Sequence, residues 1–136
     1  MDFTFVWPEW PTALGDQASF VCAGVTAFFG VFYLFLPGTA LRVRQLQTHP
    51  NHPEAIGEAR SSMAGFYLGA GLCAILFAQP FIYLTLGFSW LFTAFGRLVS
   101  ILSDRGGTIV NTIWLIVELA LGLVPLAVFF GFFPAS

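Results

Sequence analysis

Two charged residues, Arg97 and Glu118, stand inside apolar runs of this 136-residue sequence. Within a membrane, each charge would cost about 2.5 to 3.5 kcal/mol unless it is paired or hydrated, so each needs a partner. If the turn at 103–107 joins two antiparallel helices, the two residues differ in height by only about 7 Å at 1.5 Å per residue. Because an extended arginine side chain spans most of that distance, the spacing predicts that the two charges meet.

Two interpretations of this charged pair are open. In the first, it is a structural ion pair whose leftover donors are satisfied by Thr93, Ser100 and Asn111, since buried polar groups need hydrogen bonds whether or not they have a function. In the second, the pair lines a polar pocket that opens toward the cytoplasm and is capped by Arg60 and Asp104.

The other residues whose types could take part in catalysis or metal binding indicate no reaction. The run 49–54 holds two histidines and a glutamate, but its prolines favour an irregular path, so we expect a solvated loop and no metal site. Cys22 and Cys73 lack the spacing of a metal or redox motif. The chain has no P-loop, GxGxxG or HExxH motif and no histidine within an apolar run that could hold haem. We therefore expect no catalytic residue and no cofactor.

The composition indicates a membrane protein. Only 9% of the residues are charged and 57% are apolar, whereas about 25% of an ordinary soluble domain is charged. Four spans of about 20 residues would use roughly 80 positions and leave only termini and connections. We predict an all-α fold, a transmembrane four-helix bundle that forms one integral membrane domain over residues 1–136. The net charge of −2 and the absence of lysine exclude a basic surface for nucleic acid.

The hydrophobic runs place the spans along the chain. Pro37 ends the first run, and Pro80 follows the second run at once, so the second and third helices should be antiparallel neighbours. The predicted helices cover about 18–37, 61–79, 80–102 and 108–133, with a polar connection at 38–60.

The arginines predict the orientation in the membrane. Three of the five lie in the 38–60 connection, and Arg97 and Arg105 flank the third connection. Because positive residues concentrate on the cytoplasmic side, the 38–60 loop should be cytoplasmic and both termini non-cytoplasmic. In a bacterium this means an inner-membrane protein with periplasmic termini. Trp7 and Trp10 are suited to anchor the chain at the membrane interface.

Small or polar residues recur on each predicted helix at spacings of three and four, which places them on one face. Such stripes should point into the bundle, leaving the Phe and Leu faces to lipid or to a partner. Gly65 and Gly69 form a GxxxG motif, for which we favour packing inside the monomer over a dimer interface. The four stripes are Ser19, Ala23, Thr26, Gly30 and Tyr33; Ser61, Gly65, Gly69 and Cys73; Thr85, Ser89, Thr93, Arg97, Ser100 and Asp104; and Asn111, Leu115, Glu118, Gly122 and Pro125.

A family resemblance covers roughly residues 18–126. The segments 58–72 and 96–106, together with Glu118, resemble small four-span bacterial membrane proteins that are catalogued only as a domain of unknown function and are DoxX-like in appearance. The resemblance implies a four-helix bundle and supplies no reaction. The polar positions that match it are Arg60, Arg97, Asp104 and Glu118.

A second resemblance lies in the first connection. Arg42 and Arg44, followed by Asn51 and Glu54, are similar to a motif of membrane-associated glutathione-transferase-like proteins, which are four-span bundles and typically trimers. Ala55 stands where that motif has its last asparagine. This resemblance implies a thiol-conjugating enzyme.

Three functions follow as hypotheses. The first is a non-enzymatic accessory or structural subunit that docks on a larger membrane complex, respiratory or photosynthetic, through its Phe-rich faces. Its partners would be the lipid bilayer and that complex, or further copies of the chain, and not nucleic acid. The second is a membrane-embedded binding or transport module for a lipophilic or anionic small molecule around Arg97 and Glu118. The third is the glutathione-transferase-like enzyme.

Overall fold

The regular structure of this chain is entirely helical over residues 7–133, the part that the computed structural model describes. Four helical spans are long and apolar enough to cross a membrane: Leu14–Phe35, Glu54–Phe77, Pro80–Ser103 and Ile109–Phe129. The protein is therefore an all-α, multi-pass membrane protein. The elements in chain order are α1 (Leu14–Phe35), α2 (Pro37–Val43), α3 (Glu54–Glu58), the π-helical turn η1 (Ala59–Met63), α4 (Ala64–Phe77), α5 (Pro80–Ser103) and α6 (Ile109–Phe129).

Helices occupy both ends of the predicted 38–60 connection, which corrects the sequence-based boundaries. The second span begins at Glu54 instead of Ser61, because its polar first turns continue the helix beyond the apolar run. Pro37 does end the first helix, but it also opens α2, since a proline at the first helical position has no intrahelical hydrogen bond to lose. At the other end of the chain, α6 stops at Phe129 instead of 133.

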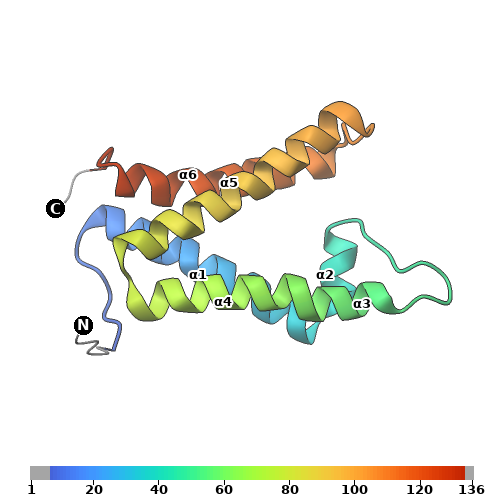
Figure 1. Cartoon of the computed structure of the whole chain (residues 1–136), viewed down its shortest axis with the longest axis horizontal. Helices are drawn as coiled ribbons and strands as arrows, with labels where there is room; N and C mark the ends of the chain where they lie inside the picture. Colours follow the sequence, from blue (N-terminus) through green and yellow to red (C-terminus); the bar gives the residue numbers. More distant parts are fainter. Residues whose placement is uncertain (1–6, 134–136) are drawn as a thin grey trace.

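The four spans pack as two pairs. Helix α1 packs mainly on α4, α5 packs mainly on α6, and a contact between α1 and α6 joins the pairs. Ala78 adopts a left-handed conformation with φ of 42° and stops α4, and Pro80 then starts α5. From this turn α4 and α5 diverge, as Figure 1 shows. The second and third helices are therefore antiparallel, but they are close neighbours only near their shared turn.

Glycines allow the backbones within each pair to approach closely. A Cβ atom on Gly71 of α4 would lie 2.5 Å from the backbone nitrogen of Ala27 in α1, and one on Gly30 would lie 2.7 Å from a backbone nitrogen of α4. Between α5 and α6, a Cβ on Gly87 would lie 2.9 Å from the carbonyl oxygen of Gly122. Such close packing is the main source of helix association in lipid, where apolar side chains gain nothing by leaving the hydrocarbon.

The GxxxG motif is not among these contacts, which overturns the prediction that it packs inside the monomer. Gly65 and Gly69 are exposed, and an added Cβ at either position would meet nothing within 4 Å. The face of α4 that is buried against α1 carries Ala64, Gly71 and Ala74 instead. Because small residues occur on several faces of this span, their spacing alone did not identify the packed face.

The stripe predicted for α1 is buried as expected, and it anchors the core. Thr26 donates its hydroxyl to the Cys22 carbonyl at 2.8 Å and accepts a hydrogen bond from Trp90 Nε1 at 2.9 Å. Before α1, Trp7 and Trp10 are both exposed, and the Trp10 ring packs edge-on against Phe20 at 5.5 Å. The predicted α1 residues, all buried, are Ser19, Ala23, Thr26, Gly30 and Tyr33.

Candidate functional site

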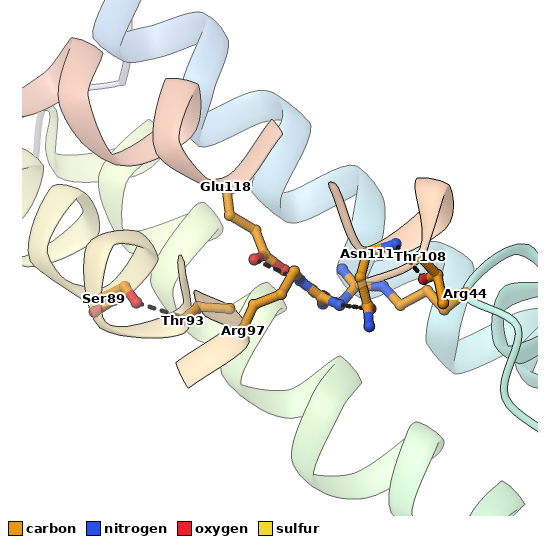
Figure 2. Close-up of polar contacts among 7 residues, drawn as sticks. All are labelled: Arg44, Ser89, Thr93, Arg97, Thr108, Asn111 and Glu118. Carbon is orange, nitrogen blue, oxygen red and sulfur yellow. Dashed lines mark hydrogen bonds and ion pairs between the residues drawn. The ribbon is translucent and has the colours of Figure 1, made fainter. Parts of the chain in front are cut away.

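Arg97 of α5 and Glu118 of α6 form a two-point ion pair (Figure 2). Arg97 donates from Nε to Glu118 Oε2 and from Nη2 to Oε1, both at 2.8 Å. The Glu118 side chain is fully buried, and that of Arg97 is 19% exposed. Two parallel hydrogen bonds between charged groups give the strongest common geometry for such a pair. The side chains of the two residues thus span the height difference expected between them.

Asn111 continues this network toward the turn between α5 and α6. Arg97 Nη1 donates to Asn111 Oδ1 at 2.8 Å, and Asn111 Nδ2 donates to the Gly106 carbonyl at 2.9 Å. Thr108 caps α6 by accepting a hydrogen bond from the backbone N–H of Asn111 at 3.2 Å. Thr93, which was also expected to satisfy Arg97, instead donates to the Ser89 carbonyl.

The third charged member is Arg44, which was predicted to lie in the polar 38–60 connection. Its side chain is only 10% exposed, and its Nη1 lies 3.7 Å from Glu118 Oε1. Three aromatic rings surround its guanidinium group, at 4.3 Å for Trp114, 5.5 Å for Tyr33 and 6.0 Å for Tyr67. We call these three rings the Arg44 cage, and we call Arg44, Arg97, Asn111 and Glu118 the ionic centre.

Helix α2 is the reason why Arg44 reaches this centre. Pro37 starts a short helix that runs across the end of α1 (Figure 1), and Arg44 is its C-terminal cap. Ala40 and Leu41 of α2 are buried against Tyr33 and Ala64 and hold the turn in place. An arginine about two helical turns past a proline, with tyrosines and a tryptophan near the same membrane end, is a signal that could have been noticed in the sequence.

Arg60 and Asp104 do not join the ionic centre, although they were predicted to cap it. Both are exposed, and neither makes an ion pair with another residue in 7–133. Arg60 lies in the π-helical turn η1, and Asp104 follows the end of α5. The position expected for Arg60 is filled by Arg44.

The ionic centre carries more positive than negative charge. Two guanidinium groups face a single carboxylate, and no second carboxylate within the described residues lies within ion-pair distance of either arginine. Nε and Nη2 of Arg44 are buried and have no hydrogen-bond partner in this part of the chain. Aromatic faces attract a cation but do not accept N–H groups as strongly as an oxygen does. The centre therefore has unused donors as well as an excess positive charge.

Two hollows lie between the diverging helices α4 and α5, and together we call them the α4–α5 cleft. The larger, of about 420 Å³, is almost wholly apolar and lies nearer the turn that joins the helices. The smaller, of about 260 Å³, reaches Thr26, Tyr67, Trp90 and Thr93. Since Tyr67 belongs to the Arg44 cage and Thr93 lies one turn before Arg97, the cleft leads to the ionic centre. The larger hollow is lined by Gly69, Ala70, Cys73, Phe77, Ile82, Thr85 and Leu86.

A line of hydroxyl groups runs along the α5 side of this cleft. Thr85, Ser89 and Thr93 each donate to the carbonyl four residues earlier, at 2.8 to 2.9 Å, so their oxygen lone pairs stay available as acceptors. All three are exposed. The predicted α5 stripe therefore faces the cleft and not the packed interior, which Leu86, Trp90 and other residues fill.

Most of the residues behind the other chemical hypotheses lie apart from this centre. His49 and His52 sit in the exposed connection between α2 and α3, and no group of three possible metal ligands occurs within residues 7–133. Arg42, Asn51 and Glu54, which carry part of the glutathione-transferase resemblance, are exposed in the first connection. Arg44, the remaining residue of that resemblance, is the only one of these residues in the ionic centre.

The fold and this centre together define a multi-pass membrane protein with a buried Arg–Glu–Arg cluster at the end of a lateral cleft. The chain belongs to the family described as "Domain of unknown function (DUF4345)", whose pattern it matches over residues 17–129. The match spans every membrane-length helix almost completely. No curated protein and no solved structure matches the chain.

Proposed function

We propose that this protein is a membrane-embedded binding module for an amphipathic, lipophilic small molecule. The polar end of that molecule would lie at the ionic centre, and its apolar body would lie in the α4–α5 cleft. The observation that carries the proposal is the continuity between the two: Tyr67 and Thr93 line the cleft and also adjoin Arg44 and Arg97. Ligand sites in proteins typically combine apolar walls with a few convergent polar groups.

The cost of the ionic centre supports this assignment. Three ionised groups lie among spans that cross the hydrocarbon, where charges are rare and usually serve substrate, ion or ligand binding. A purely structural role would need only the Arg97–Glu118 pair. Arg44 adds a second cation that this pair does not require, together with donors that the described residues leave unused.

The other two hypotheses stay predictions. The accessory-subunit hypothesis depends on the exposed phenylalanines, which suit lipid as well as a protein partner. The glutathione-transferase hypothesis depends on Arg44 and on three exposed residues of the first connection, Arg42, Asn51 and Glu54. Neither hypothesis uses the Arg97–Glu118 pair or the cleft, which is why we rank ligand binding first.

Blocking the cleft tests the proposal. A Cβ on Gly69 meets nothing within 4 Å, so Gly69→Phe should fold normally while its ring fills the larger hollow. We expect this variant to lose the small molecule that wild-type protein retains in native mass spectrometry after gentle extraction. Gly65→Phe is the matched control, because Gly65 is equally unobstructed on the same helix but does not line the cleft. No retained molecule in wild-type protein, or equal retention in both variants, would count against the proposal.

We also propose that the end carrying α2 and the ionic centre faces the cytoplasm of a bacterial inner membrane, with periplasmic termini. The support is the arginine distribution, with Arg42, Arg44 and Arg60 in the first connection and Arg105 in the third. Alkaline phosphatase fused to the C-terminus should be active, because it folds in the periplasm. A green fluorescent protein fused at the same position should be dark. The reverse pattern would invert the orientation.

A further inference from the structure

The excess charge of the ionic centre indicates what kind of head group it would bind. Arg44 and Arg97 together carry two positive charges, and Glu118 supplies one negative charge. Inside the membrane, an uncompensated charge is expensive unless a partner or water neutralises it. A ligand with a single negative charge would balance the centre, whereas a neutral ligand would leave it charged and a dianion would reverse its sign.

Both guanidinium groups have donors for such a head group. Arg97 uses three of its N–H groups on Glu118 and Asn111, which leaves two. Nε and Nη2 of Arg44 carry three more, none with a hydrogen-bond partner in the described chain. Tyr67 connects these Arg44 atoms with the smaller hollow, because it lines that hollow and its ring centre lies 6.0 Å from the guanidinium carbon of Arg44.

The shape of the cleft favours one alkyl chain. Its α4 wall consists largely of small residues, Gly69, Ala70 and Cys73, and its larger hollow is almost free of polar surface. From Thr85 to Arg97 the distance along α5 is about 18 Å at 1.5 Å per residue, which is close to the length of a common fatty acyl chain. A planar carboxylate also matches the fork of a guanidinium group, to which it binds through two parallel hydrogen bonds.

We infer that the ligand is a single-chain amphiphile with a monoanionic carboxylate head, such as a long-chain fatty acid, and that Arg44 is its principal head-group residue. This inference rests on the proposed binding function and adds the chemical class of the ligand. The carboxylate would take the unused N–H groups of Arg44 and Arg97, and the alkyl chain would extend through the α4–α5 cleft toward Thr85.

Tryptophan fluorescence tests the inference, because Trp90 lines the cleft and Trp114 belongs to the Arg44 cage. The protein carries Trp7→Phe and Trp10→Phe, so that Trp90 and Trp114 are the remaining fluorophores, and it is placed in phosphatidylcholine nanodiscs. The probes are stearic acid brominated in mid-chain and the matching brominated alcohol. At alkaline pH the acid is ionised, and we expect it to quench the tryptophan fluorescence at a concentration about tenfold lower than the alcohol does. The reason is that its carboxylate forms hydrogen bonds between two charged groups, which the alcohol cannot form.

The variants locate the head group. Arg44→Gln should remove the preference for the acid, Arg44→Lys should keep part of it, and Arg60→Gln, an exposed arginine at the same end, should leave it unchanged. In protein that retains Arg44, equal quenching by the acid and the alcohol would overturn the inferred carboxylate head group and leave the binding proposal standing. This comparison holds even if Arg44→Gln fails to fold. Tighter binding of a single-chain alkyl phosphate than of the acid would overturn the carboxylate assignment. If neither amphiphile quenches the fluorescence more than brominated bulk lipid does, the binding proposal itself is overturned.

Discussion

Glu118→Gln lowers the free energy of unfolding by about 3 to 5 kcal/mol, the range for removing one partner of a buried ion pair. The side chain is fully buried and is the only carboxylate within ion-pair distance of Arg97 and Arg44 among the described residues. Glutamine preserves the shape but leaves both guanidinium groups without a counter-charge. The loss is measured by reversible unfolding in mixed micelles with increasing denaturing detergent.

The matched control for this change is Glu58→Gln. Glu58 is exposed in α3 and makes no ion pair within the described chain, so its replacement should alter stability by less than about 0.5 kcal/mol. A double-mutant cycle with Arg97→Gln then measures the coupling, which should exceed about 1 kcal/mol for residues in direct contact. Equal stability of Glu118→Gln and Glu58→Gln would show that the ionic centre does not hold α5 and α6 together.

Gly71→Ala is expected to destabilise the protein by about 3 kcal/mol, the upper part of the usual range for overpacking. The new Cβ would lie 2.5 Å from the backbone nitrogen of Ala27, and a backbone atom cannot move aside as a side chain can. Relieving the contact requires α1 and α4 to separate along the main packed face of that pair. The same detergent unfolding series measures the loss.

Gly65→Ala provides the control on the same helix. An added Cβ there meets nothing within 4 Å, and alanine is a better helix former than glycine by about 1 kcal/mol, so stability should hold or rise. This pair of variants separates the two possible packed faces of α4. Loss of stability in Gly65→Ala with none in Gly71→Ala would restore the GxxxG face as the site of helix packing.

The helices were predictable because their signal is local. Apolar runs of the required length mark the four spans, and Pro37 and Pro80 end or begin helices where the sequence indicates. The partnership of Arg97 with Glu118 was also predictable, since two charges in apolar runs on either side of a short turn have few alternatives. The packed face of α1 was predictable for a similar reason, because its small and polar residues occupy one face.

The amino-acid sequence by itself thus determined the class of protein, the approximate spans and the charged pair at the centre. Only the tertiary structure decided that Arg44 joins this pair in place of Arg60, that Gly71 and not Gly65 packs against α1, and that α4 and α5 diverge to leave a cleft. The physical reason is that lipid removes the usual preference for burying apolar side chains. Which faces meet then depends on close backbone contacts between distant segments, and these are not encoded in the hydrophobic pattern of any one helix.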